Sequence, residues 1–158
     1  MQNKADGSLK SFEEIGKRHH LKITPQRIAV YKELMNLKDS HPSSEMIYGR
    51  VHQNDPHISF DTVNRTLLTF AQIGIVDIVK GISGPRRFDP GDREHHHIYC
   101  QACGTIIDFN HEDYDNLTVP EEIQRKYQIS GKRMVLSGLC ATCIRKNNKN
   151  KLKEKICE

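Results

Sequence analysis

Residues 59–88 read SFDTVNRTLLTFAQIGIVDIVKGISGPRRF, and this segment predicts the fold of the first half of the chain. It opens with Ser59, a good helix N-cap, and continues with apolar residues at three- and four-residue spacing up to Gly74. That pattern predicts an amphipathic helix with a glycine stop. Residues 75–79 then read as a strand, and a turn rich in glycine leads to a second short strand at 86–88.

Further helices are predicted on the N-terminal side of this stretch. Thr24 and Pro25 offer a hydroxyl cap and a proline at the first helical position. Ser43 can cap another helix before Ser59. Helices followed by a β-hairpin describe a winged helix-turn-helix, in which the helix before the hairpin enters the major groove of DNA. The order of elements therefore predicts a DNA-binding domain.

The predicted helix before the hairpin carries hydrogen-bonding side chains that suit base edges and phosphates. We expect the following residues to contact DNA: Ser59, Thr62, Asn64, Arg65 and Thr66. A solvated face on an ordinary small helical domain is the competing interpretation. The periodic pattern by itself leaves both interpretations open.

Composition and charge bound the class of protein. The chain has 158 residues, of which 36% are hydrophobic, and this suits one mid-sized or two small polar domains. No stretch approaches the roughly 18 apolar residues of a membrane span, and the N-terminus lacks the apolar core of a signal peptide. We therefore expect a cytoplasmic protein that does not contact the membrane. Residues 1–90 carry 13 Lys or Arg against 10 Asp or Glu, whereas residues 91–143 carry 5 against 8. A basic first half suits phosphates and an acidic second part suits cations, although ordinary scatter also gives such an imbalance.

The second part of the chain has a different pattern. Short apolar runs at 98–99, 105–107 and 134–136 predict strands, and residues 119–127 predict a helix between the last two. These elements describe a small α/β domain.

Four of the five cysteines are paired by spacing, as Cys100-x-x-Cys103 and Cys140-x-x-Cys143. In a chain expected in the cytoplasm, such pairs indicate metal or redox chemistry rather than disulfides. Each pair can place two thiolates on one ion, and four thiolates complete the tetrahedral shell of a structural Zn²⁺. A redox CxxC is the competing interpretation, and the presence of two pairs in a strand-rich domain favours zinc.

Three consecutive histidines, His95 to His97, precede the first cysteine pair. Alternate residues of a strand share a face, so we expect His95 and His97 to point together and His96 to point away. Without other ligands nearby, such a run reads as a solvated surface segment.

Three residues elsewhere are candidate partners for these histidines: Asp89 at the end of the hairpin, Asp108 on the strand after the first cysteine pair, and His41 before Ser43. A mixed set of nitrogen and oxygen ligands suits Fe²⁺, Mn²⁺ or Zn²⁺. Because these ligands come from both halves of the chain, the ion would stabilise only the arrangement that assembles them all. That selectivity is a physical basis for a switch.

The sequence resembles the ferric uptake regulator (Fur) superfamily from about Phe12 to Cys143. The matching segments are LKITPQR, HPSSEMIY, DTVNRTLLTFAQIGIV, RRFD, EHHHIYCQACGTIIDF and LCATC. The resemblance implies an α+β fold, with a winged-helix DNA-binding domain over residues 1–90 and a small α/β dimerisation and metal-binding domain over 91–143. The resemblance also implies a homodimeric repressor that binds double-stranded operator DNA. Residues 144–158 are too polar to fold alone, and we expect them to form a flexible basic tail.

The resemblance also assigns ligands. It places the structural zinc on Cys100, Cys103, Cys140 and Cys143. It places a regulatory Fe²⁺ or Mn²⁺ on His41, Asp89, His95, His97 and Asp108. With an aspartate at position 108, the sequence resembles the peroxide-sensing PerR subgroup, whereas iron-sensing members of the family commonly have glutamate there. By resemblance to that subgroup, we expect peroxide sensing to oxidise His41 and His95 of this chain.

The chain departs from the family pattern at two positions that matter for function. Lys132 stands where many iron sensors have a histidine ligand of a further metal site, so that site is predicted to be absent or altered. Asn64 stands where the family usually has tyrosine on the recognition helix.

Four functions are compatible with these features to different degrees. A peroxide-responsive repressor with Fe²⁺ or Mn²⁺ as corepressor is favoured, and an iron-responsive repressor of metal uptake genes is the alternative. A metalloenzyme would need an open coordination position and a substrate pocket, and the sequence shows no nucleophile or phosphate-binding loop, so we expect no catalysis and no small-molecule substrate. The outward-facing polar residues of the predicted recognition helix argue against an adaptor that binds only protein.

Overall fold

A computed structural model describes residues 9–79, 84–90, 95–129 and 131–147 of the chain. The chain divides into two compact units, Met1–Arg93 and Glu94–Glu158. Both helices and sheets are present, as the predicted α+β fold class requires. Among the described residues, no helix combines the length and the apolar character of a membrane span.

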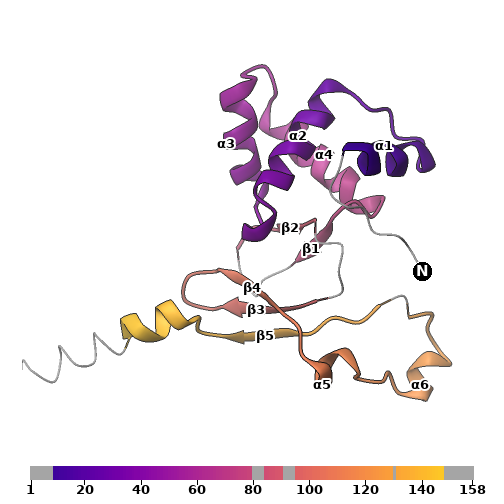
Figure 1. Cartoon of the computed structure of the whole chain (residues 1–158), viewed down its shortest axis with the longest axis vertical. Helices are drawn as coiled ribbons and strands as arrows, with labels where there is room; N and C mark the ends of the chain where they lie inside the picture. The colour runs from indigo at the N-terminus through magenta and orange to yellow at the C-terminus, as the bar shows by residue number, and fades with distance from the viewer. Residues whose placement is uncertain (1–8, 80–83, 91–94, 130, 148–158) are drawn as a thin grey trace, which may run out of the picture. The chain divides into compact units, whose positions relative to one another are not determined.

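Helices make up most of the first unit (Figure 1). They are α1 (Leu9–Arg18), α2 (Pro25–Asn36), α3 (Ser44–Asn54) and α4 (Phe60–Gln72), and a short 3-10 helix, η1 (Lys38–Ser40), precedes α3.

Hydroxyl side chains cap the last three of these α-helices. The Oγ1 of Thr24 accepts a hydrogen bond from the Arg27 amide at 3.4 Å, and the Oγ of Ser59 accepts one from the Thr62 amide at 3.2 Å. Ser43 caps α3 in the same way. Each cap satisfies a backbone N–H that the helix itself leaves without a partner. The helix starts predicted from the sequence are therefore confirmed.

The predicted hairpin follows α4 directly. Gly74 ends the helix with φ of +75°, a conformation that glycine adopts without steric cost. Strands β1 (Asp77–Val79) and β2 (Arg87–Asp89) pair antiparallel, with Ile78 opposite Phe88. Phe88 is fully buried, so the hairpin is anchored in the core of its own unit.

One apolar core joins the helices and the hairpin of the first unit. Its buried members are Phe12, Val30, Tyr31, Leu34, Ile47, Val51, Ile58, Val63, Leu67, Phe70, Val76 and Phe88. Phe12 stacks on Tyr31 with ring centroids 4.4 Å apart and meets Phe70 edge-on at 5.3 Å. Such aromatic pairs stabilise by about 0.5–1.5 kcal/mol beyond the area they bury. Phe12 is fully buried and anchors helix α1 in this core.

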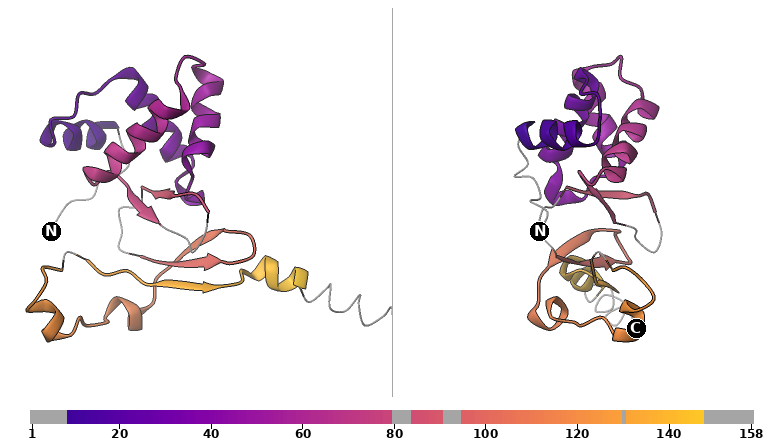
Figure 2. Two further views of the ribbon diagram at one scale, coloured as in Figure 1. Left: turned by 180° about the vertical axis from the view of Figure 1, so that it is seen from behind. Right: turned by 90° about the vertical axis from the view of Figure 1, so that its right-hand side faces the viewer.

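The second unit contains a three-stranded sheet with the order β4-β3-β5. Strand β3 (His96–Cys100) pairs antiparallel with β4 (Ile106–Phe109) and parallel with β5 (Val135–Gly138). The long connection from β4 to β5 contains two one-turn helices, α5 (Glu112–Asp115) and α6 (Glu121–Gln124), as Figure 2 shows.

Two expectations for the second unit need correction. The helix predicted over 119–127 is limited to α6, because Pro120 takes the cap position and hydrogen-bonded turns follow Gln124. Residues 141–147 are helical, so the first four residues assigned from the sequence to a flexible tail belong to a helix. The remainder of that tail, 148–158, lies outside the described residues.

Candidate metal centres and recognition helix

The four paired cysteines come together in the second unit. Strand pairing explains this, because parallel β3 and β5 place Cys100 beside Gly138, two residues before Cys140. A turn with Gly104 at φ of +70° returns the first pair toward its own strand, and the Gly104 amide donates to the Cys100 carbonyl at 2.8 Å. The sulfur atoms of the four cysteines all lie within 4.8 Å of one another. The clustering predicted from the two CxxC motifs is confirmed.

The thiols of this cluster differ in acidity. The backbone N–H of Cys140 donates to the Cys100 sulfur at 3.2 Å, and this hydrogen bond lowers the pKa of Cys100 to about 6. The neighbouring Cys140 and Cys103 thiols raise the pKa of Cys143 to about 12. The Cys100 thiol therefore loses its proton readily, whereas the Cys143 thiol keeps its proton unless a cation stabilises the thiolate. Four clustered sulfurs with this need fit a tetrahedral divalent cation, and zinc is the ion that such a donor set prefers.

A second cluster in the same unit contains two of the three consecutive histidines. Antiparallel pairing of β3 with β4 sets His97 opposite Asp108. The Nε2 atoms of His95 and His97 each lie 3.5 Å from Oδ1 of Asp108. Both histidines are buried, and their rings are 4.7 Å apart. One carboxylate oxygen thus faces two imidazole nitrogens.

His96 points to a different part of the unit, as the strand alternation predicts. Its Nε2 lies 3.0 Å from Oδ1 of Asp115, and its Nδ1 accepts a hydrogen bond from the Met134 amide at 3.1 Å. An Nδ1 that accepts from an amide is unprotonated, so a neutral ring carries its proton on the Nε2 that faces Asp115. The contact with Asp115, about twenty residues away in sequence, carried no signal in the sequence pattern.

The first unit holds another buried pair of predicted ligands. His41 is 2% exposed and Asp89 is 3% exposed, and their ligand atoms lie within 4.8 Å of each other. The Phe88 amide donates to the Pro42 carbonyl at 2.9 Å, which ties the His41 loop to the strand that carries Asp89. Each unit thus offers imidazole and carboxylate donors, buried in the first unit and with a half-exposed Asp108 in the second, and such nitrogen and oxygen donors are of the kind that first-row divalent metals bind.

Helix α4 presents only some of the residues predicted to contact DNA. Arg65 is exposed and forms an ion pair with Asp61, with 2.8 Å between Nε and Oδ2. Ser59 and Thr62 lie at the start of the helix, where their hydroxyls are 3.0 Å apart.

The predicted position of Thr66 on α4 needs correction. It is 7% exposed and lies on the buried side of α4 with Val63 and Phe70, so its predicted place on the outer face is wrong. Its position three residues after Val63 and four before Phe70 follows the apolar stripe, a signal that the choice by polarity overlooked. Asn64 lies at the edge of the helix, where its Oδ1 accepts a hydrogen bond from the Ser44 hydroxyl at 2.8 Å.

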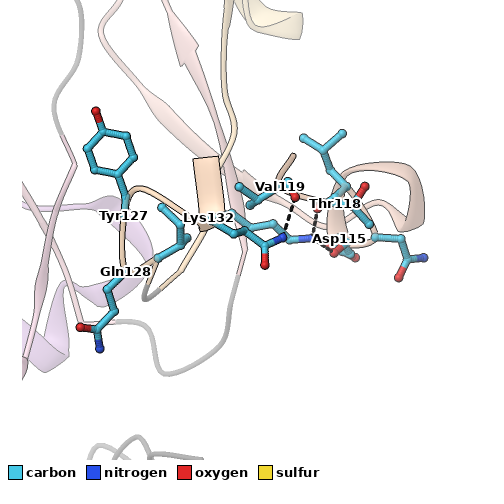
Figure 3. Close-up of a pocket in the computed structure, with 10 residues that line it drawn as sticks. Asp115, Thr118, Val119, Tyr127, Gln128 and Lys132 are labelled. Carbon is cyan, nitrogen blue, oxygen red and sulfur yellow. Dashed lines mark hydrogen bonds between the residues drawn. The ribbon is translucent and has the colours of Figure 1, made fainter. Parts of the chain in front are cut away.

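The ammonium group of Lys132 contacts main-chain oxygens in the second unit (Figure 3). Its Nζ donates to the carbonyl of Leu117 at 2.6 Å and also to that of Asp115. These residues line an open pocket beside the connection from β4 to β5. A protonated lysine supplies a positive charge and no lone pair. Lys132 therefore does not serve as a metal ligand in this arrangement.

A winged helix-turn-helix unit followed by a unit with four-cysteine and His/Asp clusters is the architecture of a metal-responsive regulator. The sequence model of the ferric uptake regulator family matches residues 18–137. The chain belongs to this family, whose members are transcriptional regulators and not enzymes.

Comparison with individual proteins gives similarities to both peroxide and iron regulators. The chain is 30% identical over 148 residues to the peroxide-responsive repressor PerR of Staphylococcus epidermidis, covering 94% of this chain and 95% of the relative. Among solved structures, it resembles the Helicobacter pylori ferric uptake regulator Fur, described with three functional metal-binding sites, at 25% identity and a TM-score of 0.72 over 90% of this chain and 97% of that one. It also resembles the Campylobacter jejuni peroxide stress regulator, at 28% identity and a TM-score of 0.63 over 83% of this chain and 98% of that one.

Proposed function

We propose that this chain is a homodimeric, metal-dependent repressor that binds double-stranded operator DNA and releases it when peroxide oxidises histidine ligands. The observation that carries the proposal is the contact of Asp108 with both His95 and His97. An aspartate at this place resembles the peroxide-sensing members of the family. The similarity to a peroxide-responsive repressor over 94% of the chain supports the same function.

Two metal sites with different roles follow from the donor sets. The four-cysteine cluster would hold a structural Zn²⁺, because thiolates select zinc and the cluster joins the two ends of the second unit. A regulatory Fe²⁺ or Mn²⁺ would be bound by His41 and Asp89 from the first unit together with His95, His97 and Asp108 from the second. Such an ion is bound fully only when both units present their ligands. Metal binding therefore favours one relation of the two units, and DNA binding is expected to favour the same relation.

Dimerisation is assigned to the second unit. Its sheet and connections expose large apolar side chains, which are Ile107, Leu117, Ile123, Tyr127, Ile129, Val135, Leu139 and Ile144. Monomeric proteins rarely leave so many apolar groups in water, and such surfaces mark protein interfaces. A second copy of the chain would cover them and would present two recognition helices to a symmetric operator.

Recognition of DNA is assigned to α4. Arg65, Ser59 and Thr62 are placed at the exposed start and side of this helix, and the hairpin after it forms the wing. Thr66, being buried, takes no part.

Peroxide sensing depends on which metal fills the regulatory site. A bound Fe²⁺ would supply the redox chemistry that transfers an oxygen atom from peroxide to a neighbouring ligand with no net loss of electrons from the metal, and Mn²⁺ supplies this chemistry poorly. The imidazole of His41 or His95 gains one oxygen atom from H₂O₂ and loses two electrons to it, and the second oxygen leaves as water. An oxidised ring is a weaker nitrogen donor, so the metal is lost and DNA is released.

An iron-responsive repressor of metal uptake genes is the alternative function. The similarity to the Helicobacter pylori Fur structure supports it, because that similarity covers 90% of this chain. All the structural roles above would be kept, and only the response to peroxide would differ.

DNA binding by protein loaded with each metal separates the two functions. A duplex selected from a random library with the Mn²⁺-loaded chain serves as the probe. Fe²⁺ and Mn²⁺ should each promote binding, and a low dose of peroxide should release only the Fe²⁺-loaded protein. Persistence of the Fe²⁺ complex after peroxide would favour the iron-responsive function.

A further inference from the structure

The loop that carries His41 has an unusual backbone conformation. His41 adopts φ of +46° and ψ of 68°, in the left-handed region that residues with a side chain rarely occupy. Such a conformation persists only where the surroundings impose it. Here the imposing contacts come from strand β2, since the Phe88 amide bonds the Pro42 carbonyl at 2.9 Å and Arg87 Nη1 lies 3.5 Å from the His41 carbonyl. The loop and the strand that carries Asp89 therefore form one bonded assembly.

A short, stiff path leads from this loop into helix α3. Pro42 follows His41, and Ser43 is the N-cap of α3, with its Oγ accepting from the Met46 amide at 3.4 Å. Ser44 is the first residue of the helix and is 7% exposed. Only two residues, Pro42 and Ser43, lie between His41 and Ser44, and the proline ring and the helix cap restrict their backbone. A shift of the loop consequently moves the Ser44 hydroxyl.

That hydroxyl is bonded to the recognition helix. Ser44 Oγ donates to Oδ1 of Asn64 at 2.8 Å, a contact between α3 and the first half of α4. Asn64 is followed directly by the exposed Arg65. Because Ser44 is buried, its hydroxyl is costly to leave without a partner, so Asn64 follows Ser44 when the loop moves.

Resting on the proposed metal-dependent binding of DNA, we propose that the Ser44–Asn64 hydrogen bond transmits the state of the His41 and Asp89 ligand pair to α4. Asn64 is then a positioning residue that sets the orientation of the recognition helix, and not a residue that reads a base. The route lies entirely within the first unit, from the His41 loop through α3 to α4. It gives a role to the asparagine that stands where the family usually has tyrosine.

A merely structural hydrogen bond between α3 and α4 makes a different prediction. It would lower the stability of the unit and weaken DNA binding equally with and without the regulatory metal. A base contact by Asn64 would be lost in Asn64→Ala but kept in Ser44→Ala, which leaves the asparagine in place. Transmission reduces the gain in affinity that the metal produces in both variants. The ratio of affinities with and without metal, measured for both variants, therefore distinguishes transmission from the other two roles.

The test compares Asn64→Ala, Ser44→Ala and the double variant in the full-length, zinc-loaded protein. The control is Asn54→Ala, which removes another asparagine that bonds between helices, since Asn54 Nδ2 contacts Glu33 Oε1 at 3.4 Å and joins α3 to α2 instead of α4. Affinity for the library-selected duplex is measured with and without Mn²⁺. Amide hydrogen exchange over residues 60–72 is measured in the same two states without DNA.

Transmission predicts that each single variant binds Mn²⁺ normally and loses about threefold to tenfold of the Mn²⁺-induced gain in DNA affinity, the effect of one net hydrogen bond. The double variant should lose no more than either single variant, because both remove the same contact. Mn²⁺ should slow exchange in α4 of the wild type and of Asn54→Ala, and should slow it less in the other variants. An unchanged Mn²⁺-induced gain, or an Mn²⁺ effect on α4 exchange that the variants preserve, would overturn the inference.

Failure of the proposed function gives a different pattern. The wild type would then bind the duplex equally with and without Mn²⁺, or not at all. Hydrogen exchange then tests the transmission by itself. An Mn²⁺ effect on α4 exchange that requires Asn64 would support the transmission, and the lack of such an effect would refute it.

Discussion

The ion pair between Asp61 and Arg65 restrains the residue that is expected to approach DNA phosphates. The two side chains are 67% and 78% exposed and lie one helical turn apart on α4, with 2.8 Å between Oδ2 of Asp61 and Nε of Arg65. Asp61→Asn frees the guanidinium and removes a negative charge from the surface that faces DNA. We expect this variant to bind DNA more tightly than the wild type.

The size of the gain follows from two small terms. An exposed pair of this spacing contributes about 0.3–0.5 kcal/mol, which Arg65 no longer gives up when it turns to a phosphate. A carboxylate and a phosphate about 10 Å apart in water repel by about 0.4 kcal/mol before salt screening. Together they amount to about 0.7–0.9 kcal/mol, or roughly threefold to fivefold for one recognition helix. In a dimer with two such helices, the gain becomes about tenfold to twentyfold at low salt.

Fluorescence anisotropy with the selected duplex at several salt concentrations measures this effect. The gain should shrink as salt rises, since both contributions are screened. Glu121→Gln is the matched control, because Glu121 pairs with Arg125 at the same spacing and the same 2.8 Å distance, on a helix of the second unit. Weaker binding by Asp61→Asn would refute the reasoning and would show that Asp61 holds Arg65 in the orientation that binds DNA. An equal gain in Glu121→Gln would reduce the effect to a change in net charge.

Further perturbations test the fold and the zinc site. Cys103→Ser should lose the bound zinc and the dimer together, as measured by metal analysis and size-exclusion chromatography, and a zinc-free variant that stays dimeric would contradict the structural role. Zinc affinity should fall as pH is lowered from about 8 to about 6, because the ion must displace the proton of Cys143, whose pKa is raised to about 12. Competition with a chelator measures the zinc affinity at each pH, and an affinity that does not change with pH would contradict the prediction. Phe12→Ala should lower the free energy of unfolding by about 3–5 kcal/mol, since Phe12 is fully buried against two aromatic rings. Denaturant titration measures this loss, and a loss below about 1 kcal/mol would mean that α1 contributes little to the core.

Local signals in the sequence predicted much of the fold because they act over a few residues. A hydroxyl before an apolar run marked the starts of α2, α3 and α4, and Gly74 marked the end of α4. Strand alternation separated His96 from its two neighbours. The spacing of the two CxxC pairs predicted that they come together, because one tetrahedral metal needs four ligands.

Features that depend on contacts distant in sequence could not be read in this way. The bond between Ser44 and Asn64 joins residues twenty positions apart, and nothing in either segment signals it. The contact between His96 and Asp115 likewise depends on how the connection after β4 folds back on the sheet. Thr66 was misplaced for another reason, since its chemistry suggested DNA while its helical phase placed it in the core.

Mass spectrometry of peroxide-treated protein shows whether histidine ligands are the residues that sense peroxide. The zinc-loaded chain is charged with Fe²⁺ or with Mn²⁺ without oxygen, bound to the selected duplex and exposed to a low dose of H₂O₂. The proposed function predicts that the Fe²⁺ form gains one oxygen atom on peptides with His41 or His95 and leaves the DNA, while the Mn²⁺ form stays bound and unmodified. Unmodified histidines with oxidised Cys100 or Cys140 would instead indicate thiol-based sensing, and an unmodified Fe²⁺ form that stays on DNA would contradict peroxide sensing altogether.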